Sequence, residues 1–440
     1  MHRSTTFAIS CALLSIATAE RVRAQQPVEG VSVNADRSLF GGVQGNERNA
    51  LSDDGRYVVL TSGANLSGVD KNGQEDIFVR DRVAGTTILM SVATDGTQAN
   101  NICYLPGMSG DGRFVAFASV ANNLTADPVG NVWNVYLHDR DPDGNGLFDE
   151  SGATTILLSK KWNGDRSDDD SVRPVFSGDG STVVFESGSN LTPGADGMIN
   201  LFVYDIAAAT LTCITTGFDG NGSGGDSRDA SLSEDGHLIA FESASPRLIA
   251  HDTNGAQDVF VFNRNTAATT RVSVATDGTE GNGASYDAAI SADGTMVAFA
   301  SAATNLDAGD QNGHADLFVR DRNLHTTTRV SLLADGTEGN GDSYNPALSD
   351  DGHLIAFETW SNNLVPLDQN DDQDVLLLDR TNKTFETISA DCIGFTANGI
   401  SSNPAITPDN RFVSFYSQAS NLSDDGLNGY IAWLRDRTIA

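Results

Sequence analysis

The stretch Ser291-Ala292-Asp293-Gly294, followed by the apolar run Met296–Ser301 (MVAFAS), decides the fold because the chain repeats it. The Asp side chain accepts nearby backbone N–H groups and the Gly tolerates a positive φ, so the phrase predicts a tight turn before a buried strand. Copies begin at Ser52, Ser109, Ser177, Ser233, Ser291 and Ser349, and a degenerate seventh copy is Thr407–Asn410. Their last residues lie 57, 68, 56, 58, 58 and 58 positions apart. This period predicts an array of like units.

Each unit reads as four short strands joined by turns. In one copy these are Tyr286–Ser291, Met296–Ser301, Asp316–Asp321 and Thr327–Leu332. Four short strands per unit are typical of a propeller blade. We therefore expect an all-β, seven-bladed β-propeller, formed as one domain by residues 25–440, with blades beginning near residues 47, 104, 172, 228, 286, 344 and 402.

The two ends of the repeat complement each other. The seventh copy has strands only up to Tyr430–Asp436, so its fourth strand is missing. Val31–Val33 precedes the first copy and mirrors Val272-Ser273-Val274 before a later one. We expect Val31–Val33 to pair with Ile431–Arg435 as the outer strand of the last blade, which closes the ring and hides its edges.

The repeat resembles the WD40-like propeller repeat of TolB-type proteins. The likeness rests on the Ser-x-Asp-Gly phrase, on strands such as Val297-Ala298-Phe299, and on strands such as Asp76–Asp81 (DIFVRD), and it covers about residues 31–437. It implies a propeller fold. TolB itself has six blades and an N-terminal α/β domain that this repeat does not match, and propellers serve many unrelated functions, so no envelope role follows.

Charge and the first residues bear on location and partners. The formal net charge is −32, from 59 acidic and 27 basic residues, which disfavours binding to nucleic acid. Residues 1–24 read as a signal peptide, with Arg3, the apolar stretch Phe7–Ala19 and a cleavage site after Ala24. A membrane span is disfavoured because this stretch is short. We expect a bacterial periplasmic or secreted protein, monomeric, with an odd number of cysteines after the leader.

The loops at the two ends of the blades differ in composition. One end, the turn face, carries the Ser-x-Asp-Gly turns and Asp-Arg pairs such as Asp81-Arg82, which we interpret as structural. The other end, the loop face, carries the loops between second and third strands and the links between blades, both acidic, such as Asp310–Asp316 and Asp335–Asp342. We expect a protein or glycan partner to bind at this acidic loop face.

An insertion in the second unit, Asp141–Gly152 (DPDGNGLFDESG), has the spacing of a calcium loop. Oxygen ligands stand at its positions one, three, five and nine, and Gly146 at position six permits a sharp turn. Position twelve is Gly152 instead of Glu. The sequence favours calcium here over a plain polar hairpin, with the ligands Asp141, Asp143, Asn145 and Asp149.

A shorter relative of this motif, Asp-x-Asn-Gly-x-x-Asp, recurs between second and third strands. It occupies Asp70–Asp76, Asp252–Asp258 and Asp310–Asp316, and Asp368–Asp374 carries Asp371 in place of the Gly. For these loops a turn is favoured over a metal site.

Evidence for catalysis is sparse. The histidines share no position in the repeat, and neither a Gly-x-Ser-x-Gly elbow nor a His-Glu-x-x-His motif is present. We expect a non-catalytic binding or scaffold module with calcium-stabilised loops. The alternative is a propeller hydrolase or lyase that acts on polysaccharide or peptide at the channel mouth. Converging His, Arg and acidic side chains would favour the enzyme, and small and amide side chains would favour binding.

Overall fold

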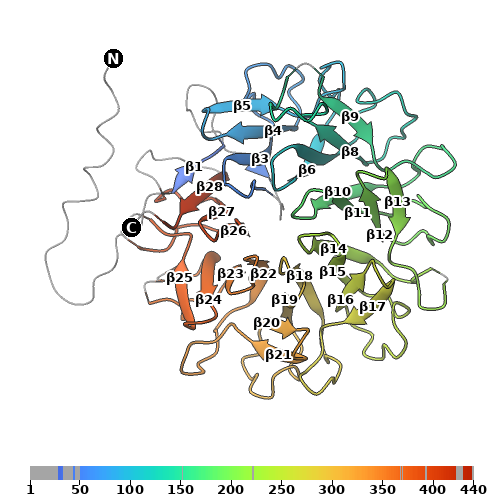
Figure 1. Ribbon diagram of the computed structural model, residues 1–440. Helices are drawn as coiled ribbons and strands as arrows, with labels where there is room; N and C mark the ends of the chain where they lie inside the picture. The colour runs from blue at the N-terminus through green and yellow to red at the C-terminus, as the bar shows by residue number, and fades with distance from the viewer. Residues whose placement is uncertain are drawn as a thin grey trace, which may run out of the picture.

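The computed structural model describes residues 28–32, 43–44, 50–150, 152–220, 222–366, 368, 370–391, 394–422 and 430–438. Within these residues the protein is all-β, with seven four-stranded antiparallel sheets arranged as the blades of a ring (Figure 1). The predicted seven-bladed propeller is therefore confirmed. The predicted leader, residues 1–24, lies outside the described residues. None of the described segments is a helix that could cross a membrane.

The blades follow one another along the chain, with the first strand of each nearest the centre of the ring (Figure 1). Blade one comprises β2 (Val43–Gln44), β3 (Tyr57–Ser62), β4 (Asp76–Asp81) and β5 (Thr86–Leu89), and blade two β6 (Cys103–Met108), β7 (Phe114–Ser119), β8 (Asn134–Asp139) and β9 (Thr154–Leu157). Blade three comprises β10 (Ser171–Phe176), β11 (Thr182–Ser187), β12 (Asn200–Asp205) and β13 (Thr210–Cys213), and blade four β14 (Ser227–Leu232), β15 (Leu238–Ser243), β16 (Asp258–Asn263) and β17 (Ala268–Arg271). Blade five comprises β18 (Ser285–Ile290), β19 (Met296–Ser301), β20 (Asp316–Asp321) and β21 (Thr326–Arg329), and blade six β22 (Ser343–Leu348), β23 (Leu354–Thr359), β24 (Asp374–Asp379) and β25 (Thr384–Thr387). Blade seven comprises β26 (Ser401–Ile406), β27 (Phe412–Ser417), β28 (Ile431–Asp436) and β1 (Glu29–Gly30).

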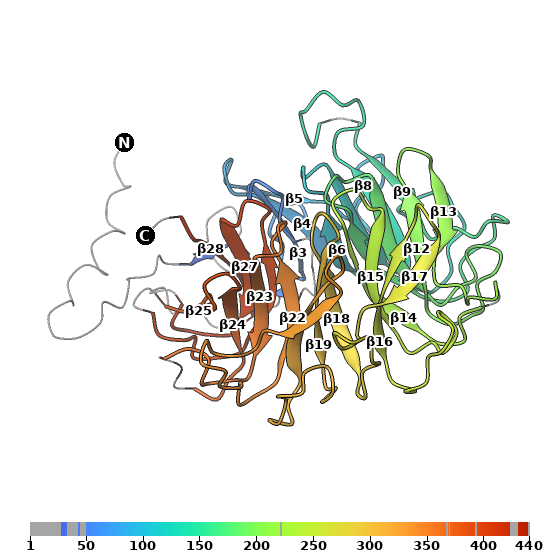
Figure 2. The same cartoon turned by 60° about the horizontal axis from the view of Figure 1, so that its bottom comes forward.

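The hydrophobic core lies between blades, because alternate side chains of one strand face opposite neighbours. On β19, Val297 and Phe299 pack with Val259 of blade four. Ala298 and Ala300 of the same strand pack with Phe357 of blade six. Figure 2 shows the neighbouring sheets side by side around the ring. Both faces of the second strands are therefore buried, which explains their almost wholly apolar sequences.

The Ser-x-Asp-Gly phrase forms the turn between the first and second strands. Asp293 Oδ1 accepts the Ser291 hydroxyl at 2.8 Å and the Thr295 N–H at 2.8 Å, and Gly294 has a φ of 70°. Arg322, from an Asp-Arg pair, donates to the Gly294 carbonyl at 2.5 Å. The paired Arg thus ties the end of the third strand to the turn of its own blade, as a structural role requires.

The N-terminal strand closes the ring as predicted. Glu29 pairs with Leu434 and Gly30 with Trp433, and the Val31 N–H donates to the Ala432 carbonyl at 2.9 Å. The assigned strand begins two residues before the expected Val31–Val33, of which Val33 lies outside the described residues. Val31 is buried with Leu51 and Leu434, so the last blade is completed by packing as well as by backbone pairing.

Candidate functional site

A cleft of about 430 Å³ opens at the loop face between blades two, three and four. Its residues come from strand ends at that face: Tyr104 begins β6, Trp133 precedes β8, and Asp169 and Asp170 precede β10. Glu186 near the end of β11 and Arg228 near the start of β14 complete its charged part. We call this cavity the loop-face cleft.

Two aromatic rings form the apolar side of the loop-face cleft. The rings of Tyr104 and Trp133 are tilted against each other with their centroids 6.4 Å apart. The backbone N–H of Trp133 donates to Asp170 Oδ1 at 2.9 Å, which fixes the main chain beside the indole ring. Both side chains are partly exposed, so they offer apolar surface to a ligand.

The buried carboxylate of Glu186 and the Arg228 guanidinium belong to the polar side of the cleft, and Arg173, which does not line the cleft, also contacts Glu186. Glu186 Oε1 accepts the Asp229 N–H at 3.0 Å and lies 3.4 Å from Arg173 NH1, and Arg228 NH1 lies 3.7 Å from Glu186 Oε2. Burial raises the pKa of Glu186, the Asp229 charge raises it further, and Arg173 opposes the rise. Arg228 also donates to Asp226 at 3.1 Å. The cleft therefore combines fixed charges of both signs.

The hydrogen bond from the Asp229 backbone to Glu186 has equivalents in two other blades. Glu242 accepts the Asp287 N–H at 2.8 Å and Glu358 accepts the Asn403 N–H at 2.7 Å. The three residues whose N–H groups donate, Asp229, Asp287 and Asn403, have positive φ angles. Each lies where the register between the first and second strands of its blade shifts, and therefore forms a β-bulge. Each buried Glu thus ties its blade to the bulge of the next blade. Desolvation raises the pKa of Glu358 to about 7.

The insertion in blade two brings three of its four predicted metal ligands into one hydrogen-bonded turn. Asp141 accepts the backbone N–H of Asn145 at 3.0 Å and that of Gly146 at 2.8 Å, and the Asn145 amide donates to Asp143 at 3.0 Å. Asp149 pairs instead with the buried Arg140, at 2.5 and 2.8 Å. Calcium at this loop stays a prediction, and Asp149 would have to share its carboxylate between the ion and Arg140.

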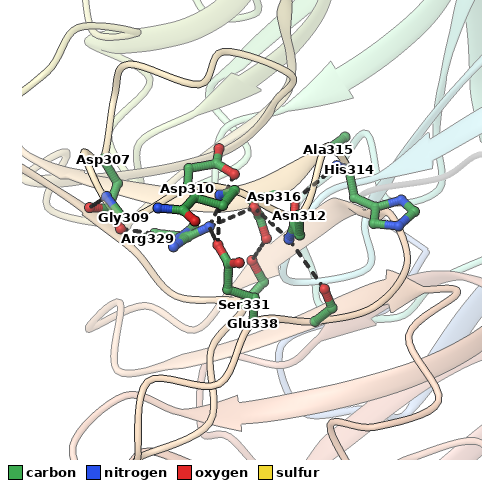
Figure 3. A network of polar contacts seen from close by, with 12 residues as sticks. Asp307, Gly309, Asp310, Asn312, His314, Ala315, Asp316, Arg329, Ser331 and Glu338 are labelled. Carbon is green, nitrogen blue, oxygen red and sulfur yellow. Dashed lines mark hydrogen bonds and ion pairs between the residues drawn. The ribbon is translucent and has the colours of Figure 1, made fainter.

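In two of the shorter acidic loops a guanidinium lies among the carboxylates. Figure 3 shows Arg329 of blade five between Asp310, Asp316 and Glu338, with N–O distances of 3.2, 3.1 and 2.5 Å. In blade four, the oxygens of Asp252, Asp258 and Glu280 lie within 4.8 Å of one another, a spacing suited to a metal ion. Arg271 already lies among them, 2.8 Å from Asp258 and in contact with Glu280.

Sequence reasoning placed the binding surface on the loop face and missed the residues of the cleft. One signal was available in the second strands, where Glu186, Glu242 and Glu358 interrupt apolar runs such as TVVFES and LIAFES. Other units carry Ala118 or Ala300 at this position. No histidine of the described residues lines the loop-face cleft, whereas Arg and acidic side chains do converge there.

Comparison with known proteins supports the fold and leaves the function open. No family model and no curated protein matches the sequence. The similar solved structures include an oligogalacturonate lyase from Vibrio parahaemolyticus, at 13% identity and TM-score 0.51, covering 95% of this chain and 92% of that one. The β-propeller domain of the trilobed protease from Pyrococcus furiosus matches at 10% identity and TM-score 0.53, covering 90% and 96%. TolB from Acinetobacter baumannii matches at 15% identity and TM-score 0.42, covering 89% and 84%. The two structures with TM-scores above 0.5 confirm the expected propeller fold, and the fold alone.

Proposed function

We propose that this protein is an exported, non-catalytic binding or scaffold module that takes a protein or glycan partner on its acidic loop face. The observation that carries the proposal is the loop-face cleft, in which the Tyr104 and Trp133 rings stand beside Glu186 and Arg228. Clefts with apolar walls and a few placed polar groups are the usual form of ligand sites. Export to the periplasm or beyond rests on the leader-like residues 1–24.

The charge distribution indicates the kind of partner. Arg228 of the cleft already pairs with Asp226, and Arg173, which does not line the cleft, pairs with Glu186. Asp169 and Asp170 remain exposed at its rim, and the whole chain carries a net charge of −32. A neutral glycan or a neutral-to-basic peptide segment therefore fits this face better than an anionic ligand.

Calcium is the proposed cofactor of the blade-two insertion, held by Asp141, Asp143, Asn145 and Asp149. The first three residues are already assembled in one turn. A bound cation would offset the repulsion of the carboxylates and stabilise the folded state. Because position twelve lacks the bidentate Glu, we expect weak affinity, on the order of 10⁻⁴–10⁻³ M.

The test compares two tryptophans. Wild type, Trp133→Ala and Trp162→Ala are immobilised and exposed to envelope extract, to neutral oligosaccharides and to basic peptides, each with and without calcium. Trp133 lines the cleft, whereas Trp162 is 68% exposed outside it and serves as the matched control. We expect Trp133→Ala to weaken capture about tenfold, equivalent to about 1.4 kcal/mol. Equal capture by all three proteins would refute the cleft as the binding site.

A hydrolase or lyase at the channel mouth is the second candidate, favoured by the convergence of Arg173, Glu186 and Asp229. Burial keeps the pKa of Glu186 above its ordinary value, as a general acid requires. Incubation of the purified protein with polysaccharides and peptides, followed by product analysis, separates the two functions. Cleavage that is lost in Glu186→Gln but kept in Trp162→Ala would establish the enzyme and displace the binding module.

A further inference from the structure

In blade six, one buried carboxylate oxygen has no partner within hydrogen-bond distance among the described residues. Asp374, at the start of β24, is 1% exposed. Its Oδ1 accepts the Ser389 hydroxyl at 2.6 Å, whereas its Oδ2 is buried and receives no hydrogen bond from the residues that the structure describes. A buried carboxylate oxygen that faces neither a donor nor a cation is costly.

The equivalent Asp residues of three other blades show what ordinarily faces this oxygen. In each, Oδ1 accepts a serine hydroxyl in the same way: Ser91 to Asp76, Ser273 to Asp258, and Ser331 to Asp316. The other oxygen, Oδ2, always has a nitrogen donor. These donors are Gln98 at 2.9 Å in blade one, Arg271 at 2.8 Å with Asn254 at 3.1 Å in blade four, and Arg329 at 3.1 Å with Asn312 at 3.1 Å in blade five.

The strand register identifies the substitutions that remove this donor in blade six. Thr387 pairs with Leu376 at the position where Arg329 pairs with Phe318 in blade five. Thr396 forms an isolated backbone β-bridge with Ala390, as Glu338 does with Leu332 in blade five. Neither threonine carries a charge or a long side chain. The aspartates at the two ends of the motif, Asp368 and Asp374, are nevertheless kept.

The described residues of the loop keep hydrogen bonds that its relatives make. The Asn370 amide donates to the Ala397 carbonyl, as the Asn312 amide donates to the Gly339 carbonyl in blade five. Asp368 Oδ1 accepts the Asn370 N–H at 3.3 Å. Blade six therefore keeps the two aspartates at the ends of the motif and the Asn370 hydrogen bond, and lacks both the guanidinium and the Glu338 carboxylate of blade five.

We propose that blade six binds a calcium ion between Asp368 and Asp374, in the place that the Arg329 guanidinium occupies in blade five. Carboxylate oxygens, completed by water, are the ligands that hard divalent cations take. The negative charge of Asp372 acts on Asp374 as well and adds to the attraction for a cation. This site shares no residue with the blade-two insertion and does not depend on the function proposed above.

The experiment titrates CaCl₂ into the chelator-treated full-length protein by calorimetry and follows thermal unfolding with and without 5 mM calcium. Thr387→Arg restores the blade-five residue and Asp374→Asn removes the ligand. We expect each variant to bind one calcium ion fewer than wild type. Thr387→Arg should also raise the melting temperature of the calcium-free protein, because its guanidinium takes the place of the ion.

Two controls make the result specific. Thr384→Arg adds the same charge at the exposed end of the same strand, β25, and should keep the wild-type number of ions. Asp141→Ala with Asp143→Ala should lose at most the ion of the blade-two insertion and keep the blade-six ion. The proposal is overturned if wild type binds no calcium, if Thr387→Arg and Asp374→Asn both bind as many ions as wild type, or if the Asp141/Asp143 variant loses all binding. In the last case the blade-two site stands alone.

Discussion

One strand position shows how different residues perform the same task. His138 in blade two and Arg320 in blade five both contact a threonine hydroxyl, that of Thr155 at 2.8 Å and that of Thr327 at 3.0 Å. Each threonine in turn donates to a carbonyl in the link after the preceding blade. Arginine stays charged in this position, whereas histidine can lose its proton, so the two blades respond differently to pH.

Burial lowers the pKa of His138 to about 4. Between this value and about 6.5, the unfolded chain binds a proton that the folded chain does not, so stability falls as pH decreases through this window and levels off below it. A shift of this size corresponds to a contribution on the order of 3 kcal/mol. We expect His138→Gln to remove this part of the pH dependence, measured by urea unfolding from pH 4 to 8. His325→Gln, at an exposed histidine, is the control and should follow wild type. If the free energy of unfolding of His138→Gln changed with pH as steeply as that of wild type, His138 would not be the source of the pH dependence.

At the scale of the strand, the fourth strands of blades four and five differ from that of blade one by a single buried cation. Arg329 at the end of β21 is buried and contacts four carboxylates, those of Asp307, Asp310, Asp316 and Glu338. Blade one has Leu89 in the Arg329 position, and its two aspartates are bridged by the Gln98 amide at 2.6 and 2.9 Å. An arginine in blade five and a glutamine in blade one thus neutralise or bridge equivalent aspartates, and replacing the first arrangement by the second tests whether they are interchangeable.

Arg329→Leu leaves buried carboxylates without their counter-ion, and we expect it to lower the free energy of unfolding by about 3–5 kcal/mol. Adding Glu338→Gln recreates the blade-one set and should recover at least half of the loss, because the new amide can bridge Asp310 and Asp316. Chemical denaturation of both variants measures the difference. A double variant less stable than Arg329→Leu would show that the blades are not interchangeable in this way.

The strands were predictable because each is encoded locally. Asp293 and Gly294 specify a turn within four residues, and the apolar run after them specifies a strand buried on both faces. The loop-face cleft was not predictable in the same way. Tyr104, Trp133 and Arg228 are far apart in sequence, and they meet only because blades two, three and four lie side by side. The Arg271 and Arg329 ion clusters were missed because their acids and their arginine lie on different segments of the blade.

At the scale of the whole molecule, stability depends on the pairing of β1 with β28. Deleting residues 25–36 uncovers the edge of β28 and removes Val31 from the core. We expect the shortened protein to aggregate or to melt at a clearly lower temperature. Glu29→Gln is the control, because it weakens only the exposed ion pair with Arg82 and keeps the backbone pairing. Light scattering and thermal unfolding measure both effects. A monomeric deletion variant with an unchanged melting temperature would disprove the importance of closure.

The pairing of the first strand with the last also governs how the molecule is made. A ribosome synthesises Glu29 near the beginning and its partner Leu434 near the end, so the outer strand of blade seven is made first and stays unpaired while the other six blades can fold. The pairing contacts do not distinguish a strand of the same chain from one of a second copy. We therefore expect high protein concentration during refolding to raise the share of domain-swapped dimers, in which each chain completes the ring of the other.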